Sequence, residues 1–306
     1  MKQLRFAGLG RGLVLGSLLG MCLLTSPRST GADGDKKAKP SKPVPTAASI
    51  LDEAQTAYAK RDMGQALTLI NKAMKLEPRN ASPYFARARL YSAQGDSEKA
   101  IQDFDRVLEL DPGQGDVYQL RGIERFRQGH AADAVVDFNK YLTLNPTQAP
   151  YHWQRGIALY YTEQFAEGKQ QFEQHQKVNP QDVENAAWHF FCVARLEGLD
   201  KARAMLIPVT QDSRVPMAQI QSLLAGQGTP EQVVEAAQIG NPSPAILERN
   251  LFYAHLYLGL YFEAIKDEKR SKEHIEKAVR YANKADYMGS VALVHSKVRK
   301  LEAKAK

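Results

Sequence analysis

The sequence predicts an all-α protein built from consecutive pairs of antiparallel helices, and two periodic features predict it. The first is a proline that recurs every 34 residues after an apolar residue and an acidic or amide residue. These prolines are Pro78, Pro112, Pro146 and Pro180. The second is a small residue and a phenylalanine that keep the same phase, as in Gly122 with Phe138 and Gly156 with Phe172. Because a unit of this length cannot bury its apolar face alone, we expect a right-handed superhelical solenoid of stacked helix pairs.

Four full repeats are expected, at 47–80, 81–114, 115–148 and 149–182. In each, a first helix leads through a short turn into a second, and Gly95 and Gly129 mark that turn in the second and third repeats. Apolar residues at i, i+4 and i+7 line one face of the second helix. The proline then ends that helix, since it lacks a backbone donor and disfavours helix in the preceding residue. This phase places Phe104 and Phe138 in the core.

An arginine recurs at one repeat position, as Arg87, Arg121 and Arg155. Its aliphatic stem can pack between repeats while the guanidinium reaches a carboxylate on the neighbouring repeat. We therefore interpret these arginines as structural in preference to ligand-binding.

The repeat phase weakens in residues 183–242, which we interpret as a degenerate repeat followed by short helices. Residues 230–239 begin with Thr229 as a helix cap and Pro230 at the first helical position. Residues 243–303 are expected to form a C-terminal helix pair and a final helix that caps the array.

The N-terminus has the pattern of an export signal. Basic residues precede an apolar run from Gly12 to Leu24, and Thr30-Gly31-Ala32 offers a small-x-small cleavage site. The run is shorter than the roughly 20 residues of a membrane-spanning helix. We interpret 1–32 as a cleaved signal peptide, which predicts a periplasmic or secreted protein, and an uncleaved anchor is less favoured. Residues 33–47, rich in Lys and Pro, are expected to be a disordered linker.

The two cysteines lie in different contexts. Leu19-Gly20-Met21-Cys22 is similar to a bacterial lipobox, but Met21 departs from the usual small residue, so lipid attachment at Cys22 is less favoured. Cys192 lies in the apolar stretch AAWHFFCVA and is expected to be a buried small hydrophobe. A mature chain with one cysteine has no intramolecular disulfide.

Four units in one 34-residue phase resemble the tetratricopeptide (TPR) repeat family. That resemblance implies that the first helices line a concave groove, with certain positions pointing inward. The residues at these positions, expected to bind a partner, are Phe85, Arg89, Gln119, Phe126, Arg127, Trp153, Ile157, Tyr160 and Tyr161. Aromatic residues and Arg are favoured at binding hot spots, and the hypothesis expects Trp153, Tyr160 and Arg127 to be partly exposed. Ordinary packing between repeats is the open alternative for Trp153 and Tyr160.

A narrower likeness appears in three segments, QRGIALYYTEQF (154–165), VARLEGLDKARAML (193–206) and ERNLFYAHLYLGLYF (248–262). In this order they resemble the NlpI-type TPR lipoproteins of bacterial envelopes. Members of that family are dimeric adaptors that bring a protease and peptidoglycan hydrolases together. The resemblance implies a protein partner and a homodimer, but not the family's particular partners or its lipid anchor.

Motifs for catalysis and metal binding are missing from the sequence. The seven histidines have no metal-ligand spacing, and no HExxH, paired CxxC, P-loop or GxSxG motif occurs. We therefore expect no catalytic residue, metal, cofactor or small-molecule substrate.

The net charge of +7 is uneven, because residues 262–306 hold 12 basic and seven acidic residues. Their signs alternate as on a solvated helix face, which does not favour a nucleic-acid partner.

The favoured function is an exported, non-enzymatic scaffold or adaptor that binds a protein or peptide in the concave groove. One alternative is a structural subunit that self-assembles. A second, less favoured, is a protein that binds carbohydrate or cell wall.

Overall fold

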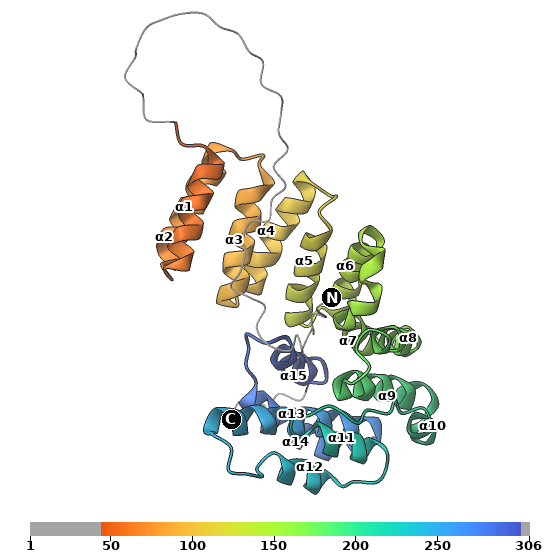
Figure 1. Cartoon of the computed structure of the whole chain (residues 1–306). Coiled ribbons are helices and arrows are strands. Elements are labelled where there is room, and N and C mark those ends of the chain that lie inside the picture. Colours follow the sequence, from red (N-terminus) through yellow and green to blue (C-terminus); the bar gives the residue numbers. More distant parts are fainter. Residues whose placement is uncertain (1–43, 301–306) are drawn as a thin grey trace, which may run out of the picture. The chain divides into compact units, whose positions relative to one another are not determined.

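The computed structural model describes residues 44–300, and Figure 1 shows their arrangement. The expected signal peptide (1–32) and most of the expected linker (33–47) lie outside the described residues. Within 44–300 the chain is all-α, which confirms the expected fold class. The described residues divide into two compact units, 44–90 and 91–300. The helices are α1 (Ala47–Ala59), α2 (Met63–Leu76), α3 (Ala81–Gln94), α4 (Ser97–Leu110), α5 (Gly115–Arg127), α6 (Ala131–Leu144), the 3-10 helix η1 (Pro146–Tyr151), α7 (Trp153–Tyr161), α8 (Phe165–Gln176), α9 (Val183–Glu197), α10 (Leu199–Ala204), α11 (Met217–Leu224), α12 (Pro230–Ala236), α13 (Pro244–Ala264), α14 (Glu268–Tyr281) and α15 (Tyr287–Val298).

The turn has one conformation in five of the helix pairs within the described residues. A residue with positive φ ends the first helix, and the next N–H bonds the carbonyl five residues back, as in Asp96 N to Tyr91 O at 2.9 Å. This is the Schellman arrangement that closes a helix C-terminus. The left-handed residues are Arg61, Gly95, Gly129, Glu163 and Lys266, with φ between 60° and 81°. Glycine supplies this backbone without strain in two turns, and three other turns adopt it with larger residues.

Phenylalanines on the second helices pack beneath small residues of the first helices. A Cβ atom placed on Gly122 would lie 2.6 Å from Phe138 Cε1, and one on Gly156 would lie 2.6 Å from Phe172 Cζ. The absence of a side chain at these glycines therefore makes room for the rings, and Phe138 and Phe172 are buried. Phe104 is buried as well, so the expected core position of Phe104 and Phe138 is confirmed.

The recurring arginine links consecutive repeats. Arg121 bonds Asp105, 16 residues earlier, at 2.7 Å, and Asp137, 16 residues later, at 2.6 and 3.0 Å. Arg155 repeats the pattern with Asn139 at 2.6 Å and Gln171 at 3.0 Å. In the first unit Arg87 donates to Asn71, again 16 residues earlier, at 2.9 Å. The structural interpretation of these arginines is thus confirmed, although amides replace carboxylates at several contacts. We call this series the arginine ladder.

The ladder ends in the fifth repeat. His189 takes the arginine position there and lies 3.5 Å from Oε1 of Glu173, 16 residues earlier. Its two ring nitrogens are buried and make no hydrogen bond within the described residues. Beyond this point the regular pairs stop: α10 is short, α11 packs on α9 and α13, and α12 packs on α11 and α13. The regular arrangement returns with α13 and α14.

The longest helix, α13, belongs to the interior of the second unit, where Ala254, Leu256, Leu258 and Leu260 are buried. Among residues 44–300, no helix combines the length and the apolar character needed to cross a membrane.

Replacing Phe138 with Ala should lower the free energy of unfolding by about 3–5 kcal/mol, because it removes a buried ring and leaves a cavity beside Gly122. Val136→Ala is the matched control on the same helix, since Val136 is 63% exposed and its loss should change the value by less than about 0.5 kcal/mol. Denaturant unfolding measures both variants. A loss below about 1 kcal/mol for Phe138→Ala would contradict this packing.

Replacing Arg121 with Gln should cost about 3 kcal/mol, because the Asp137 carboxylate, 1% exposed, would keep only Arg125 as an ionic partner. The control is Lys272→Gln, which breaks an exposed pair with Glu276 and should cost less than about 1 kcal/mol. Equal losses in the two variants, measured by the same unfolding experiment, would show that the ladder does not hold the repeats together.

Candidate functional site

Four of the residues expected to bind a partner lie in the core. Phe126, Ile157, Tyr160 and Tyr161 are buried, and Tyr160 has no exposed surface. The expectation that Tyr160 is partly exposed is therefore wrong. Tyr160 is a packing residue, as the alternative interpretation of its position expected.

For Phe126 and Tyr161 the physical reason is the last helix, which covers the face of α5 and α7 on which they lie. Tyr160 instead packs against Phe165 of α8 and Trp188 of α9, with ring centroids 5.5 and 5.4 Å away, and donates a hydrogen bond to Glu263 of α13. Helix α15 packs on α14 and also on α5 (Figure 1). Tyr287, its first residue, stacks on Phe126 with ring centroids 5.3 Å apart and meets the Trp153 ring edge-on at 5.1 Å. Further along, His295 Nδ1 lies 3.1 Å from the Tyr161 hydroxyl. We call the surface that α15 covers the inner face.

A half-buried carboxylate on α13 joins the residue that follows α15 to two other helices. Glu263 of α13 accepts a hydrogen bond from the Tyr160 hydroxyl at 2.5 Å and from Arg299 at 2.6 Å, and Arg195 lies 3.4 Å away. Burial lowers the pKa of His295 to about 4, so its ring is neutral near pH 7. These contacts make α15 an integral part of the second unit.

The remaining expected residues are more accessible. Arg127 pairs with Glu124 at 2.6 Å and keeps 22% of its side chain exposed, and Trp153 is half-buried. Gln119 is half-buried beside His152. Phe85 and Arg89, both half-buried, lie on α3 in the first unit. The structure thus brings Gln119 and Trp153 together, and separately gathers the buried rings under α15.

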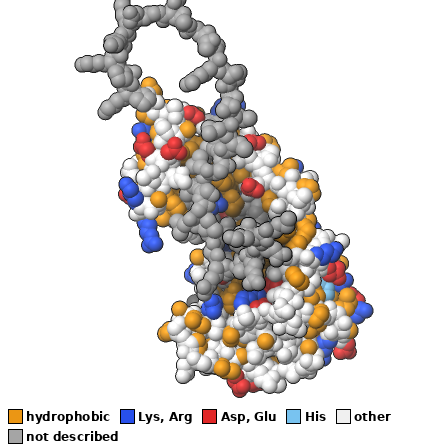
Figure 2. All heavy atoms as spheres, viewed as in Figure 1, with side chains coloured by type: hydrophobic (Ala, Val, Ile, Leu, Met, Phe, Trp, Pro, Cys, Tyr) orange, Lys and Arg blue, Asp and Glu red, His pale blue; other side chains and the backbone are white. Residues whose placement is uncertain are grey.

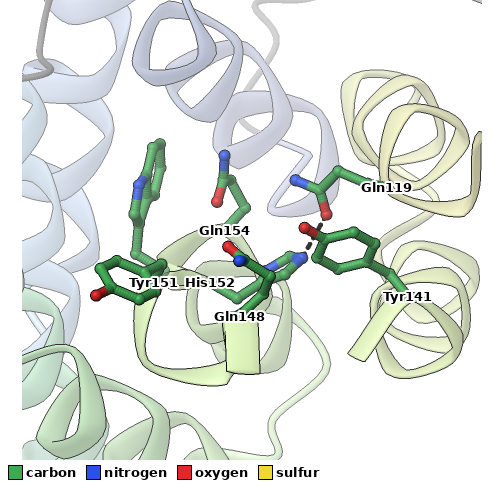
Figure 3. Close-up of a pocket in the computed structure, with 7 residues that line it drawn as sticks. Gln119, Tyr141, Gln148, Tyr151, His152 and Gln154 are labelled. Atoms are coloured by element: carbon green, nitrogen blue, oxygen red, sulfur yellow. Dashed lines mark hydrogen bonds between the residues drawn. The ribbon is translucent and has the colours of Figure 1, made fainter. Parts of the chain in front are cut away.

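Gln119 and Trp153 share a small open pocket of about 180 Å³ (Figure 3). Its lining comes from α5, α6, η1 and the start of α7. The lining residues are Gln119, Tyr141, Gln148, Tyr151, His152, Trp153 and Gln154.

The pocket lies where the fourth repeat departs from the regular phase. Helices α1, α3 and α5 begin 34 residues apart, at Ala47, Ala81 and Gly115, which predicts the next start at residue 149. Pro150 disfavours helical geometry at Ala149, and α7 begins only at Trp153. Residues 146–151 form η1 instead, held by Gln171 Nε2 on the Ala149 carbonyl at 2.7 Å and His175 Nδ1 on the Pro150 carbonyl at 2.9 Å. The delayed helix start therefore shapes the pocket wall.

His152 forms the base of this pocket. Its Nδ1 accepts the backbone N–H of Arg155 at 3.2 Å and so caps α7, which leaves the ring proton on Nε2 to bond the Gln119 side-chain oxygen. Burial lowers the pKa of His152 to about 4, so the ring is neutral at physiological pH. Tyr141 lies against the same ring, with centroids 5.3 Å apart.

Sequence reasoning missed five of the seven lining residues. Tyr151 and Gln154 follow no repeat pattern, Gln148 shares its repeat position with Asn80 and Gln114, and His152 occupies a position held by tyrosine in the two preceding repeats. The one available signal was Pro150, a proline in a place where the repeat phase calls for the first helical turn.

Acidic and basic side chains alternate over the described surface that Figure 2 shows, without a large region of one sign.

Comparison with known proteins supports the repeat family and the fold. A tetratricopeptide-repeat family profile matches residues 69–102. No curated protein matches the sequence. Among solved structures, a tetratricopeptide repeat protein from Parabacteroides merdae is 15% identical, with 81% of this chain and 98% of that chain covered and a TM-score of 0.56. This likeness shows the fold.

Two further structures are more distant in shape. YrrB, described as a TPR protein with an unusual peptide-binding site, is 21% identical over 74% of this chain and 97% of its own, with a TM-score of 0.40. MamA from Desulfovibrio magneticus RS-1 is 18% identical over 52% of this chain and 89% of its own, with a TM-score of 0.47.

The matched profile, the 34-residue phase and the shared turn agree with one another. Residues 69–102 match the tetratricopeptide repeat, and the fold of the chain is similar to that of a solved tetratricopeptide repeat protein.

Proposed function

We propose that this chain is a non-enzymatic scaffold that binds a protein or peptide partner at the pocket beside η1. The observation that carries the proposal is a group of polar side chains without internal partners on an otherwise well-packed helical array. Within the described residues, the side chains of Gln148, Gln154 and Tyr151 make no hydrogen bond, and Tyr151 is 57% exposed. Gln148 and Tyr151 are exposed and Gln154 is half-buried, so these side chains are available to a ligand at no cost to the internal packing.

The proposed mode of binding differs from the one expected for an open concave groove. The inner face between α5 and α13 is filled by α15, so a long helix cannot lie along it. The pocket instead admits one anchoring group of a segment that passes over η1 and the start of α7. Trp153 and Gln119 are the two residues of the original groove hypothesis that such a segment would touch. Phe85, Arg89 and Arg127 remain predicted contacts.

We further propose that the protein is exported, as the sequence of residues 1–32 indicates. In that compartment an adaptor role of the kind found in NlpI-type proteins would fit, and a homodimer stays a prediction.

Export predicts a mature N-terminus at or near Asp33, and intact-mass measurement of the protein from its native host tests it. A chain that still begins at Met1, or one that carries diacylglycerol on Cys22, would contradict cleavage at this site.

Peptide binding can be tested by selecting a displayed library of random peptides on the full chain. We expect enriched peptides whose affinity falls at least about tenfold for the pocket variant Gln148→Ala/Gln154→Ala, because these amides provide contacts to the ligand. Neither side chain makes an internal hydrogen bond, so the variant should fold normally, which circular dichroism checks.

The matched control is Lys140→Ala/Thr143→Ala, two exposed residues of α6 outside the pocket, which should leave binding unchanged. If no peptide is enriched over an unrelated helical protein, or if the two variants behave alike, the proposed function is wrong.

A further inference from the structure

The pocket beside η1 is polar but carries no charge. Its seven lining residues are three glutamines, two tyrosines, a tryptophan and His152, whose pKa of about 4 keeps it neutral. Arg155, whose charge acts on His152, is engaged by Asn139 and Gln171. Burial and the charge of Asp116 raise the pKa of Tyr141. A charged group entering this pocket would lose water without meeting an opposite charge.

The available groups include both donors and acceptors. The Gln119 side-chain oxygen is taken by His152, which leaves the Gln119 amide hydrogens to donate. The Tyr141 hydroxyl and the Gln148 amide have no internal partner within the described residues and can donate or accept. Figure 3 shows the Gln119 side chain and the Tyr141 hydroxyl directed toward the His152 ring, with the Gln148 amide to one side of it, while the Tyr151 hydroxyl points away.

Such a set matches a carboxamide better than the other polar side chains. A carboxylate only accepts hydrogen bonds, and an ammonium group only donates them. A carboxamide does both from two adjacent atoms, so it can satisfy the Gln119 donors and an acceptor on Tyr141 or Gln148 together. A hydroxyl offers a single atom and fewer contacts.

The size of the pocket limits the ligand to one such group. Its volume of about 180 Å³ equals the volume that about six water molecules occupy in liquid water. Sites that enclose drug-sized ligands measure about 300–1,000 Å³. The pocket therefore holds one side chain and adjoining main chain, with the rest of the segment outside.

We propose that this pocket receives the carboxamide of an asparagine or glutamine in an extended segment of a partner protein, and that it discriminates against Asp, Glu and Lys at that position. The inference rests on the proposed peptide-binding function and adds the chemical class of the anchoring residue.

The test starts from a peptide enriched on the full chain, in which the anchoring Asn or Gln is replaced in turn by Asp or Glu, Lys and Ala. The acidic replacement keeps the size of the side chain and changes its charge. We expect it to weaken peptide binding at least about tenfold near pH 7.5, and we expect the Lys peptide to bind no more tightly than the acidic one. Affinity of the parent peptide should stay constant from about pH 7.5 to about pH 5.5, because His152 stays neutral across this range.

A charge change in the protein gives an independent check. Gln148→Glu places an acid at the pocket without breaking an internal hydrogen bond, so it should improve binding of the Lys peptide and weaken that of the parent. Gln148→Ala should weaken the parent peptide without favouring Lys.

Two results would overturn the inference and leave the peptide-binding function intact. In one, acidic or Lys peptides bind as well as the parent. In the other, enriched peptides contain no Asn or Gln that affects affinity. Failure to enrich any peptide would contradict the proposed function itself. If a neutral N-acetylglucosamine oligomer bound in a way that depends on the pocket, and no peptide bound, the pocket would be a carbohydrate site. Both the proposed function and this inference would then be wrong.

Discussion

The stacking of the repeats depends on one interaction, the guanidinium that joins positions 16 residues to either side. Because Arg121 contacts Asp105 on the second helix of one repeat and Asp137 on that of the next, it sets the distance between consecutive second helices. Asp137 is 1% exposed, so the pair is shielded from solvent and its geometry matters. The Gly122 and Phe138 contact sets the spacing within a pair in the same way. The two contacts together explain why the 34-residue phase is kept.

The change in architecture after α9 coincides with the end of this ladder. His189 is shorter than arginine and makes no hydrogen bond to Glu173, so the fifth repeat lacks the link that the earlier repeats share. Short helices α10 to α12 follow before the pair of α13 and α14. The chain then places α15 on the inner face, where Tyr287, His295 and Arg299 contact residues of α5, α7 and α13. Aromatic residues that would otherwise be open to a partner become the core of the second unit.

Residue patterns predicted the regular part of this structure well. The phase of Phe138 and Gly122 identified the core, and the recurring arginine identified the ladder, because each depends on contacts at fixed sequence separation. Positive φ at Gly95 and Gly129 could be anticipated from glycine itself. The same turn at Arg61 and Glu163 could not, because no residue type at those positions indicates a left-handed backbone. Burial of Tyr160 depends on Trp188 of α9 and on Glu263 of α13, which lies 103 residues later, and no repeat pattern relates such distant segments. The pocket likewise arises from a departure at Pro150.

A closed inner face and an open, uncharged pocket together define how this protein can bind. The closed inner face follows from α15 being packed against α5 and α7 in the native state, which is the central claim. Amide hydrogen exchange read by mass spectrometry over residues 287–298 tests it most directly. If α15 is part of the second unit, its amides should be protected to nearly the same degree as those of α7 and should exchange with the unit as a whole. Exchange of residues 287–298 within seconds, while α7 stays protected, would show that α15 leaves the inner face open.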